Sequence, residues 1–213
     1  MVPLGMLILL ALTFDFINGF HDTANAVATV VSTRVMRPGV AIAMAAVLNF
    51  IGAMSGTAVA KTVGSGIVGS SVPLHAIAAA LLAAIAWNLF TWYRGIPSSS
   101  SHALIGSLLG AGTASLGFGA AHWDVLRDKV VLPLLLSPVI GFLAALWLMR
   151  LLVKVFASMP PSRVGPIFRH TQVVSAAFMA FSHGGNDAQK TMGIITLALV
   201  SSGVLPTFHV PMW

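Results

Sequence analysis

Two related polar motifs lie inside apolar segments of this chain. The first, NGFHDTANA, spans residues 18–26, and the second, SHGGNDAQK, spans residues 182–190. Asp22 and Asp187 occupy matching places in the two motifs, and they are two of only five acidic residues. A carboxylate at the centre of a membrane helix costs about 3 kcal/mol on insertion scales, so it marks a candidate functional site. A paired polar motif of this kind is typical of transporters built from internal repeats.

The first motif segment gathers its polar side chains on one helical face. At spacings of three and four residues, it carries Asp15, Asn18, Asp22, Asn25 and Thr29. Such spacings place side chains on the same side of a helix. A polar stripe that only joins helices needs amides and hydroxyls rather than carboxylates, so we favour a ligand site over this alternative.

The glycines of both motifs predict broken helices. Gly19 lies in the first motif, and Gly184 and Gly185 lie in the second. An opened helix is tolerated at membrane depth only where its freed backbone groups line a cavity. Free N–H groups suit an anion, whereas free carbonyl groups and aspartates suit a cation. The chemistry predicted for the two motifs is therefore that of a co-transport site.

The second motif differs from the first in its charges. Lys190 either neutralises the aspartate of its own motif or faces an anionic substrate, and the sequence leaves both readings open. Ala180 stands where a counterpart of Asp15 would lie, so the site is at best pseudo-symmetric. His21 and His183 either take up protons near neutral pH or act as neutral hydrogen-bonding groups, and we favour the second reading.

Four consecutive serines form a third polar feature. They occupy residues 98–101, between Pro97 and His102, and a stretch of small residues follows. Serine hydroxyls and the first N–H groups of a helix form a donor cluster that suits an oxyanion. The alternative is an ordinary serine N-cap in a loop. Because the run lies between two apolar segments, we predict the tip of a re-entrant hairpin that covers residues 96–121.

The composition indicates that most of this chain lies in a lipid bilayer. Of its 213 residues, 57% are hydrophobic and only 8% are charged, against roughly 25% charged residues in soluble domains. The net charge is +6, but the basic residues stand in ones and twos at the ends of apolar runs. That pattern is typical of topology-setting loops rather than of a nucleic-acid surface. The chain has no cysteine, which excludes disulfides and cysteine-ligated metals.

The apolar runs predict an all-α polytopic membrane protein, because about 20 apolar residues cross the hydrocarbon core. The expected spans cover approximately residues 4–33, 40–60, 74–92, 130–149 and 171–205. The more basic connections are predicted to be cytoplasmic, which makes the two motif segments antiparallel. We therefore expect an inverted-repeat transporter with broken helices and a re-entrant hairpin. Its parts are a first repeat (1–157), a cytoplasmic connection (158–169) and the start of an incomplete second repeat (170–213).

These motifs resemble those of the PiT family of inorganic phosphate transporters. That family carries a Gly-x-Asn-Asp-x-x-Asn-like motif once in each inverted half, and here residues 19–26 and 184–190 match the two copies. His21 stands where many members have Asn, and residues 97–102 look like the family's serine-rich hairpin. The resemblance covers essentially the whole chain. It implies a multi-pass protein of the cytoplasmic membrane that takes up inorganic phosphate with a coupling cation, H⁺ or Na⁺.

The resemblance also implies which residues form the site. Those expected to bind substrate and ion are Asp22, Asn25, Ser100, Ser101, Asn186, Asp187 and Gln189. The secondary candidates are Asp15, Asn18, His21, Thr23, Ser99, His102 and Lys190. The Gly-Phe-His-Asp variant is similar to that of bacterial low-affinity members, a type associated with protons and with metal–phosphate complexes. No cofactor is expected beyond the coupling cation, and the question of a metal ligand set stays open.

The chain departs from the family in length. Family members continue into a second serine-rich hairpin, whereas this sequence stops at Trp213. We therefore expect an N-terminal part that does not transport phosphate alone, with a second copy or a missing C-terminal half as partner. The alternatives are a non-transporting membrane subunit and an intramembrane hydrolase that uses Ser100 or Ser101 with His102. Adjacent helix residues point about 100° apart, which disfavours the hydrolase, so no enzyme activity is expected.

Overall fold

The computed structural model describes residues 3–69 and 72–211, except for the side chain of Thr23. Within these residues every regular element is helical, apart from one antiparallel bridge between Val68 and Ala121. The predicted all-α class is confirmed. In chain order the helices are α1 (Leu4–Ser32), α2 (Pro38–Met54), α3 (Ala58–Lys61), η1 (Thr62–Gly66), α4 (Leu74–Arg94), α5 (Ser100–Leu116), η2 (Phe118–Ala120), α6 (Trp123–Leu126), η3 (Arg127–Val131), α7 (Leu132–Phe156) and α8 (Pro161–Ser201).

Three helical stretches in the described part are long and apolar enough to cross a membrane: Leu4–Ser32, Leu74–Arg94 and Trp123–Phe156. A fourth span arises if α2 and the α3–η1 stretch count as one, although they are bent by 63° at the break between them. The last predicted span, near residues 171–205, is helical but is less apolar than these three stretches, because it carries the polar second motif.

The predicted helix breaks at the motif glycines are wrong. α1 and α8 both run without interruption through their motifs. In α8, glycine serves close packing instead, since a Cβ on Gly184 would overlap the backbone of Asn49 in α2. A Cβ on Gly52 would likewise overlap the backbone of Phe181. Small residues of this kind let membrane helices approach closely.

A helical hairpin presents the serine run. α4 and α5 lie antiparallel, and the connection between them turns at Gly95, whose φ of 63° is left-handed. Ser99 is the N-cap of α5 and accepts a hydrogen bond from the backbone N–H of His102 at 3.3 Å. The observed hairpin therefore uses α4 as its first arm, whereas the predicted one began only at residue 96. That it enters and leaves the membrane on one side stays a prediction.

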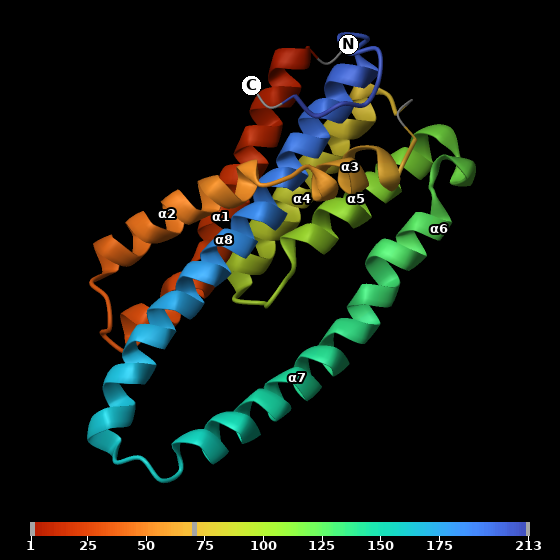
Figure 1. Cartoon of the computed structure of the whole chain (residues 1–213). Helices are drawn as coiled ribbons and strands as arrows, with labels where there is room; N and C mark the ends of the chain where they lie inside the picture. Colours follow the sequence, from red (N-terminus) through yellow and green to blue (C-terminus); the bar gives the residue numbers. More distant parts are fainter. Residues whose placement is uncertain (1–2, 70–71, 212–213) are drawn as a thin grey trace.

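The α2 helix and the α4–α5 hairpin pack around the two motif helices, α1 and α8 (Figure 1). α1 and α8 lie side by side and antiparallel, with α2 against α8 and the α4–α5 hairpin on the other side. The main core lies between α1, the hairpin, η1 and α8. Its largest fully buried side chains include Leu7, Phe14, Ile67, Ile77, Leu81, Leu104, Leu108, Ile194 and Leu197.

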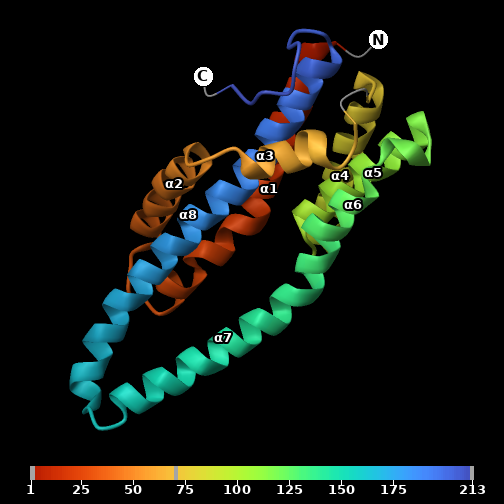
Figure 2. The same cartoon turned by 45° about the vertical axis from the view of Figure 1, so that its right-hand side comes forward.

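α7 stands apart from this assembly in both views (Figures 1 and 2), and none of its residues is buried. It returns to α8 through a short connection at residues 157–160. Helix α8 therefore already begins inside the predicted connection of 158–169, and the cytoplasmic location of that connection stays a prediction. α8 begins at Pro161, because proline is tolerated in the first helical turn, where its missing N–H leaves no bond unmade. The division into two repeats stays a prediction.

Candidate functional site

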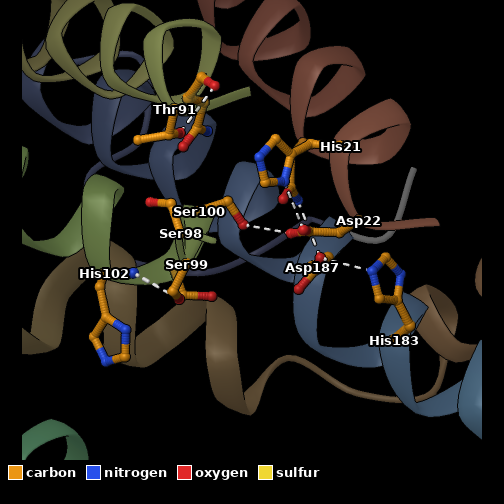
Figure 3. Close-up of polar contacts among 12 residues, drawn as sticks. His21, Asp22, Thr91, Ser98, Ser99, Ser100, His102, His183 and Asp187 are labelled. Carbon is orange, nitrogen blue, oxygen red and sulfur yellow. Dashed lines mark hydrogen bonds and ion pairs between the residues drawn. The ribbon is translucent and has the colours of Figure 1, made fainter. Parts of the chain in front are cut away.

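The hairpin tip contacts the first motif through Asp22. The Ser100 hydroxyl donates to Asp22 Oδ2 at 2.9 Å, and His21 Nδ1 lies 2.8 Å from Oδ1 of the same carboxylate (Figure 3). Ser100 is buried, while Asp22 and His21 are partly buried. The first turn of α5 thus holds a hydroxyl against a carboxylate at the middle of α1.

The second motif reaches the same serines through a buried ion pair. Lys190 Nζ lies 2.9 Å from Asp187 Oδ1, and the Lys190 side chain is only 3% exposed. Its ammonium also donates to Ser101 Oγ at 2.8 Å and to Ser100 Oγ at 3.4 Å. Lys190 therefore forms the ion pair with Asp187 that the first reading predicts, and it also contacts the hydroxyls of the hairpin tip. That Lys190 faces an anionic substrate stays a prediction.

Two further polar side chains contact the second carboxylate oxygen of Asp187. Asn18 Nδ2 donates to Asp187 Oδ2 at 3.2 Å, and His183 Nε2 lies 3.1 Å from the same oxygen. The contact between His183 Nε2 and Asp187 is short, but its geometry is not that of a hydrogen bond. The other ring nitrogen of His183, Nδ1, lies 3.0 Å from Asn49 Oδ1. The amide oxygen of Asn18 is buried without a hydrogen-bond partner in the described chain. An unpaired buried oxygen beside a carboxylate suits a cation.

Three of these groups could hold a cation together. Ligand atoms of Asp22, His183 and Asp187 all lie within 4.8 Å of one another. Carboxylate oxygens suit Na⁺ and other hard cations, and an added imidazole widens the choice to transition metals.

A cavity of about 350 Å³ opens beside Asp187, between α1, α2 and α8. Asp15 lines it and accepts a hydrogen bond from the Thr191 hydroxyl at 2.8 Å. Asn18, Asn49 and Asp187 add polar groups to an otherwise mostly apolar wall.

The structure brings together only part of the predicted set. Asp22, Asp187, Ser100, Ser101, Asn18, His21 and Lys190 form one connected group, with Asp15 on the adjoining cavity. Asn25 is exposed, without a side-chain hydrogen bond to any described residue, and Asn186 is exposed and donates to the Ser182 carbonyl at 2.9 Å. The Thr23 side chain lies outside the described residues. Whether each of these binds substrate stays a prediction.

Gln189 is buried against α3. Its Oε1 accepts the backbone N–H of Val59 at 3.2 Å, so it supports the first turn of α3. Ser101 and His102 diverge, because Ser101 lines a cavity with Lys190 whereas His102 lines a different one with Ser99. This divergence opposes the hydrolase alternative, which needs their side chains to hydrogen-bond.

Two contributors were not predicted, Asn49 and Thr191. Asn49 is an amide inside an apolar segment, which is itself a signal of an interhelical partner. Thr191 lies four residues after Asp187 on the same helix. Its pairing with Asp15 depends on how α1 and α8 pack, and one sequence does not reveal that.

Comparison with known proteins gives a consistent result. Residues 18–213 match the PHO4 phosphate transporter family. The chain is 48% identical over 216 residues to a probable low-affinity inorganic phosphate transporter of Bacillus subtilis, with 98% of this chain and 63% of that protein covered. It is 42% identical to the low-affinity inorganic phosphate transporter PitA of Escherichia coli, with 95% of this chain and 47% of that protein covered.

A solved structure described as "The sodium-dependent phosphate transporter" is also similar, with a TM-score of 0.76 and 23% identity. The match covers 97% of this chain and 71% of that one, and at this identity it shows the fold alone. The chain spans 63% of the length of its Bacillus subtilis relative. The predicted resemblance is confirmed: the chain belongs to the PHO4 phosphate transporter family and is a multi-pass protein of the cytoplasmic membrane.

Proposed function

We propose that this chain forms part of a transporter that moves inorganic phosphate across the cytoplasmic membrane together with a cation. The named relatives are low-affinity inorganic phosphate transporters, and the similar solved structure is described as sodium-dependent. The observation that carries the proposal is the position of Ser100. Its hydroxyl lies between Asp22 of the first motif and Lys190 of the second, so the hairpin tip touches both copies.

Phosphate is received at the hairpin tip. A tetrahedral anion needs several converging donors, and Ser100, Ser101 and Lys190 offer two hydroxyls and an ammonium within one hydrogen-bonded group. α5 begins at Ser100, so the positive end of its helix dipole adds to the attraction.

The cation is received by the carboxylates. Asp22 and Asp187 supply carboxylate oxygens that bind Na⁺ or accept H⁺. The antiparallel course of α1 and α8 supports an inverted-repeat arrangement, in which such a site lies where the two repeats meet.

The ion pair between Asp187 and Lys190 couples the two ligands. Phosphate alone draws Lys190 away and leaves Asp187 without its partner, whereas a cation alone leaves Lys190 unpaired. A buried charge without a partner costs several kcal/mol, so either ligand alone binds weakly. When both bind, each charge exchanges its old partner for a new one, and the two affinities rise together.

A second form of the substrate is a metal–phosphate complex. The close approach of Asp22, His183 and Asp187 favours it, because two carboxylates and an imidazole form a ligand set for a divalent metal. Mn²⁺ binding, followed by electron paramagnetic resonance, tests this form. We expect His183→Gln to weaken Mn²⁺ binding and leave Na⁺-dependent phosphate binding in place, and equal Mn²⁺ binding by both proteins would rule it out.

Equilibrium binding of ³²P-labelled phosphate to the purified chain in lipid nanodiscs tests the proposed function. We expect Asp22→Asn to lower the affinity at least tenfold, because the variant loses a carboxylate at the cation site. Asp124→Asn is the matched control, since Asp124 is an exposed aspartate that contacts none of these groups. Equal phosphate affinity in the Asp22 variant and the native chain would overturn the proposal.

A further inference from the structure

Two cavities of similar size adjoin the Asp187–Lys190 pair, one lined by acidic and the other by basic side chains. Each has a volume of about 350 Å³. The first, between α1, α2 and α8, is lined by Asp15 and Asp187, and none of its described lining residues is a lysine or arginine. The second is lined by Lys129 and Lys190, and none of its described lining residues is acidic. The buried ion pair thus separates a carboxylate-lined space from a lysine-lined one.

The lysine-lined cavity combines elements that are distant in sequence. Its wall comes from α3, η1, α5, η3 and α8, and its polar residues are Thr62, Ser101, Lys129, Asn186 and Lys190. The rest of the wall is apolar. A charge beside low-dielectric walls projects a stronger field into a cavity than it does in open water.

Lys129 is an exposed lysine at the edge of this cavity, and no ion pair neutralises its charge. In the described chain it has no hydrogen-bond or ion-pair partner. The neighbouring Asp128 pairs with Arg127, whose Nε lies 2.8 Å from its Oδ1, and it also attracts Lys129 electrostatically. Lys190 is already neutralised by Asp187, so the positive charge left in the cavity is that of Lys129.

We propose that this cavity is a separate anion vestibule, in which Lys129 attracts phosphate and passes it to Ser101 and Lys190. The inference rests on the proposed function and adds a residue outside both motifs and the serine run. Ser101 is the link, since it lines the vestibule and its hydroxyl accepts a hydrogen bond from the Lys190 ammonium at 2.8 Å. Cation and anion then approach the Asp187–Lys190 pair from opposite sides.

The absence of cysteine in the native chain gives a direct test. A cysteine at Thr62 reports only on the lysine-lined cavity, and one at Ala46 reports only on the carboxylate-lined cavity. Each single-cysteine protein, in maltoside detergent, is treated with an anionic and with a cationic methanethiosulfonate reagent. The ratio of the two rates measures the sign of the local potential. We expect Thr62→Cys to favour the anionic reagent by roughly tenfold relative to Ala46→Cys.

Charge removal then identifies the source of the potential. Adding Lys129→Gln to Thr62→Cys lowers the anionic preference several-fold, whereas adding Lys154→Gln leaves it unchanged, because Lys154 lies near the far end of α7. Inorganic phosphate slows labelling of Thr62→Cys while Lys129 is present. The same measurement in nanodiscs with phosphatidylglycerol distinguishes free phosphate from a lipid headgroup.

The outcomes separate this inference from the proposed function. An anionic preference that survives Lys129→Gln overturns the vestibule, even where the native chain binds labelled phosphate. Labelling that phosphatidylglycerol slows and inorganic phosphate does not also overturn it, and assigns the charge to a lipid contact. The effect of Asp22→Asn on phosphate binding tests the proposed function independently of these labelling experiments.

Discussion

At the scale of single residues, the account depends on the buried pair Asp187–Lys190. The lysine is 3% exposed and the carboxylate 17% exposed, so neither charge is well solvated without the other. Removal of one partner of a buried pair typically costs about 3–5 kcal/mol, mostly because it leaves the other charge uncompensated.

A double-mutant cycle tests this dependence. We expect Lys190→Gln and Asp187→Asn each to lower the thermal stability of the purified chain strongly. The double variant should be more stable than the sum of the two losses predicts, because no buried charge is left unpaired. Additive losses in the cycle would show that the two charges do not stabilise each other.

Much of the site could be predicted at this scale. The repeated motif identifies Asp22 and Asp187, and the structure places their ligand atoms within 4.8 Å. The partners of Asp15 and His183 could not be predicted, because they depend on the rotation of one packed helix against another. Gln189 illustrates the same limit, since it belongs to the motif but its amide oxygen binds the backbone of α3.

At the scale of helices, the glycines of α8 have a role that differs from the predicted one. The glycines of the polar motif predict an opened helix, but α8 is continuous. A residue that permits a break and a residue that permits close packing look identical in one sequence. The structure distinguishes the two cases by what a Cβ at the glycine would contact, and at Gly184 it would overlap the backbone of Asn49.

Alanine substitution at two glycines measures this difference. We expect Gly184→Ala to destabilise the chain by roughly 1–3 kcal/mol, because α2 must move away from α8 to admit the methyl group. Gly19→Ala is the matched control, since a Cβ there meets nothing within 4 Å. Thermal unfolding in detergent, followed by loss of the monodisperse peak, compares them. Equal melting temperatures for the two variants would contradict close packing at Gly184.

At the scale of the whole molecule, the all-α class and the antiparallel motif helices could be predicted from hydropathy and loop charge. The isolation of α7 could not be predicted, because a mostly apolar helix has the same sequence pattern whether protein or lipid surrounds it. The structure leaves all of α7 unburied, and the chain spans 63% of its Bacillus subtilis relative.

Reconstitution tests the whole molecule. We expect the chain alone, in proteoliposomes with a cation gradient, to accumulate no labelled phosphate. We expect accumulation when the chain is fused to the part of the Bacillus subtilis relative that lies beyond the match. The fusion that carries Asp22→Asn serves as the inactive control. Uptake by the unfused chain at the rate of the fusion would contradict this expectation.

The most direct measurement of the central claim is the phosphate affinity of the native chain as a function of cation concentration. If phosphate takes Lys190 from Asp187 while the cation takes Asp187 from Lys190, added Na⁺, or a lower pH, should raise phosphate affinity at least tenfold. Lys190→Gln should remove that dependence. A phosphate affinity that stays constant across Na⁺ concentration and pH would contradict a coupled site.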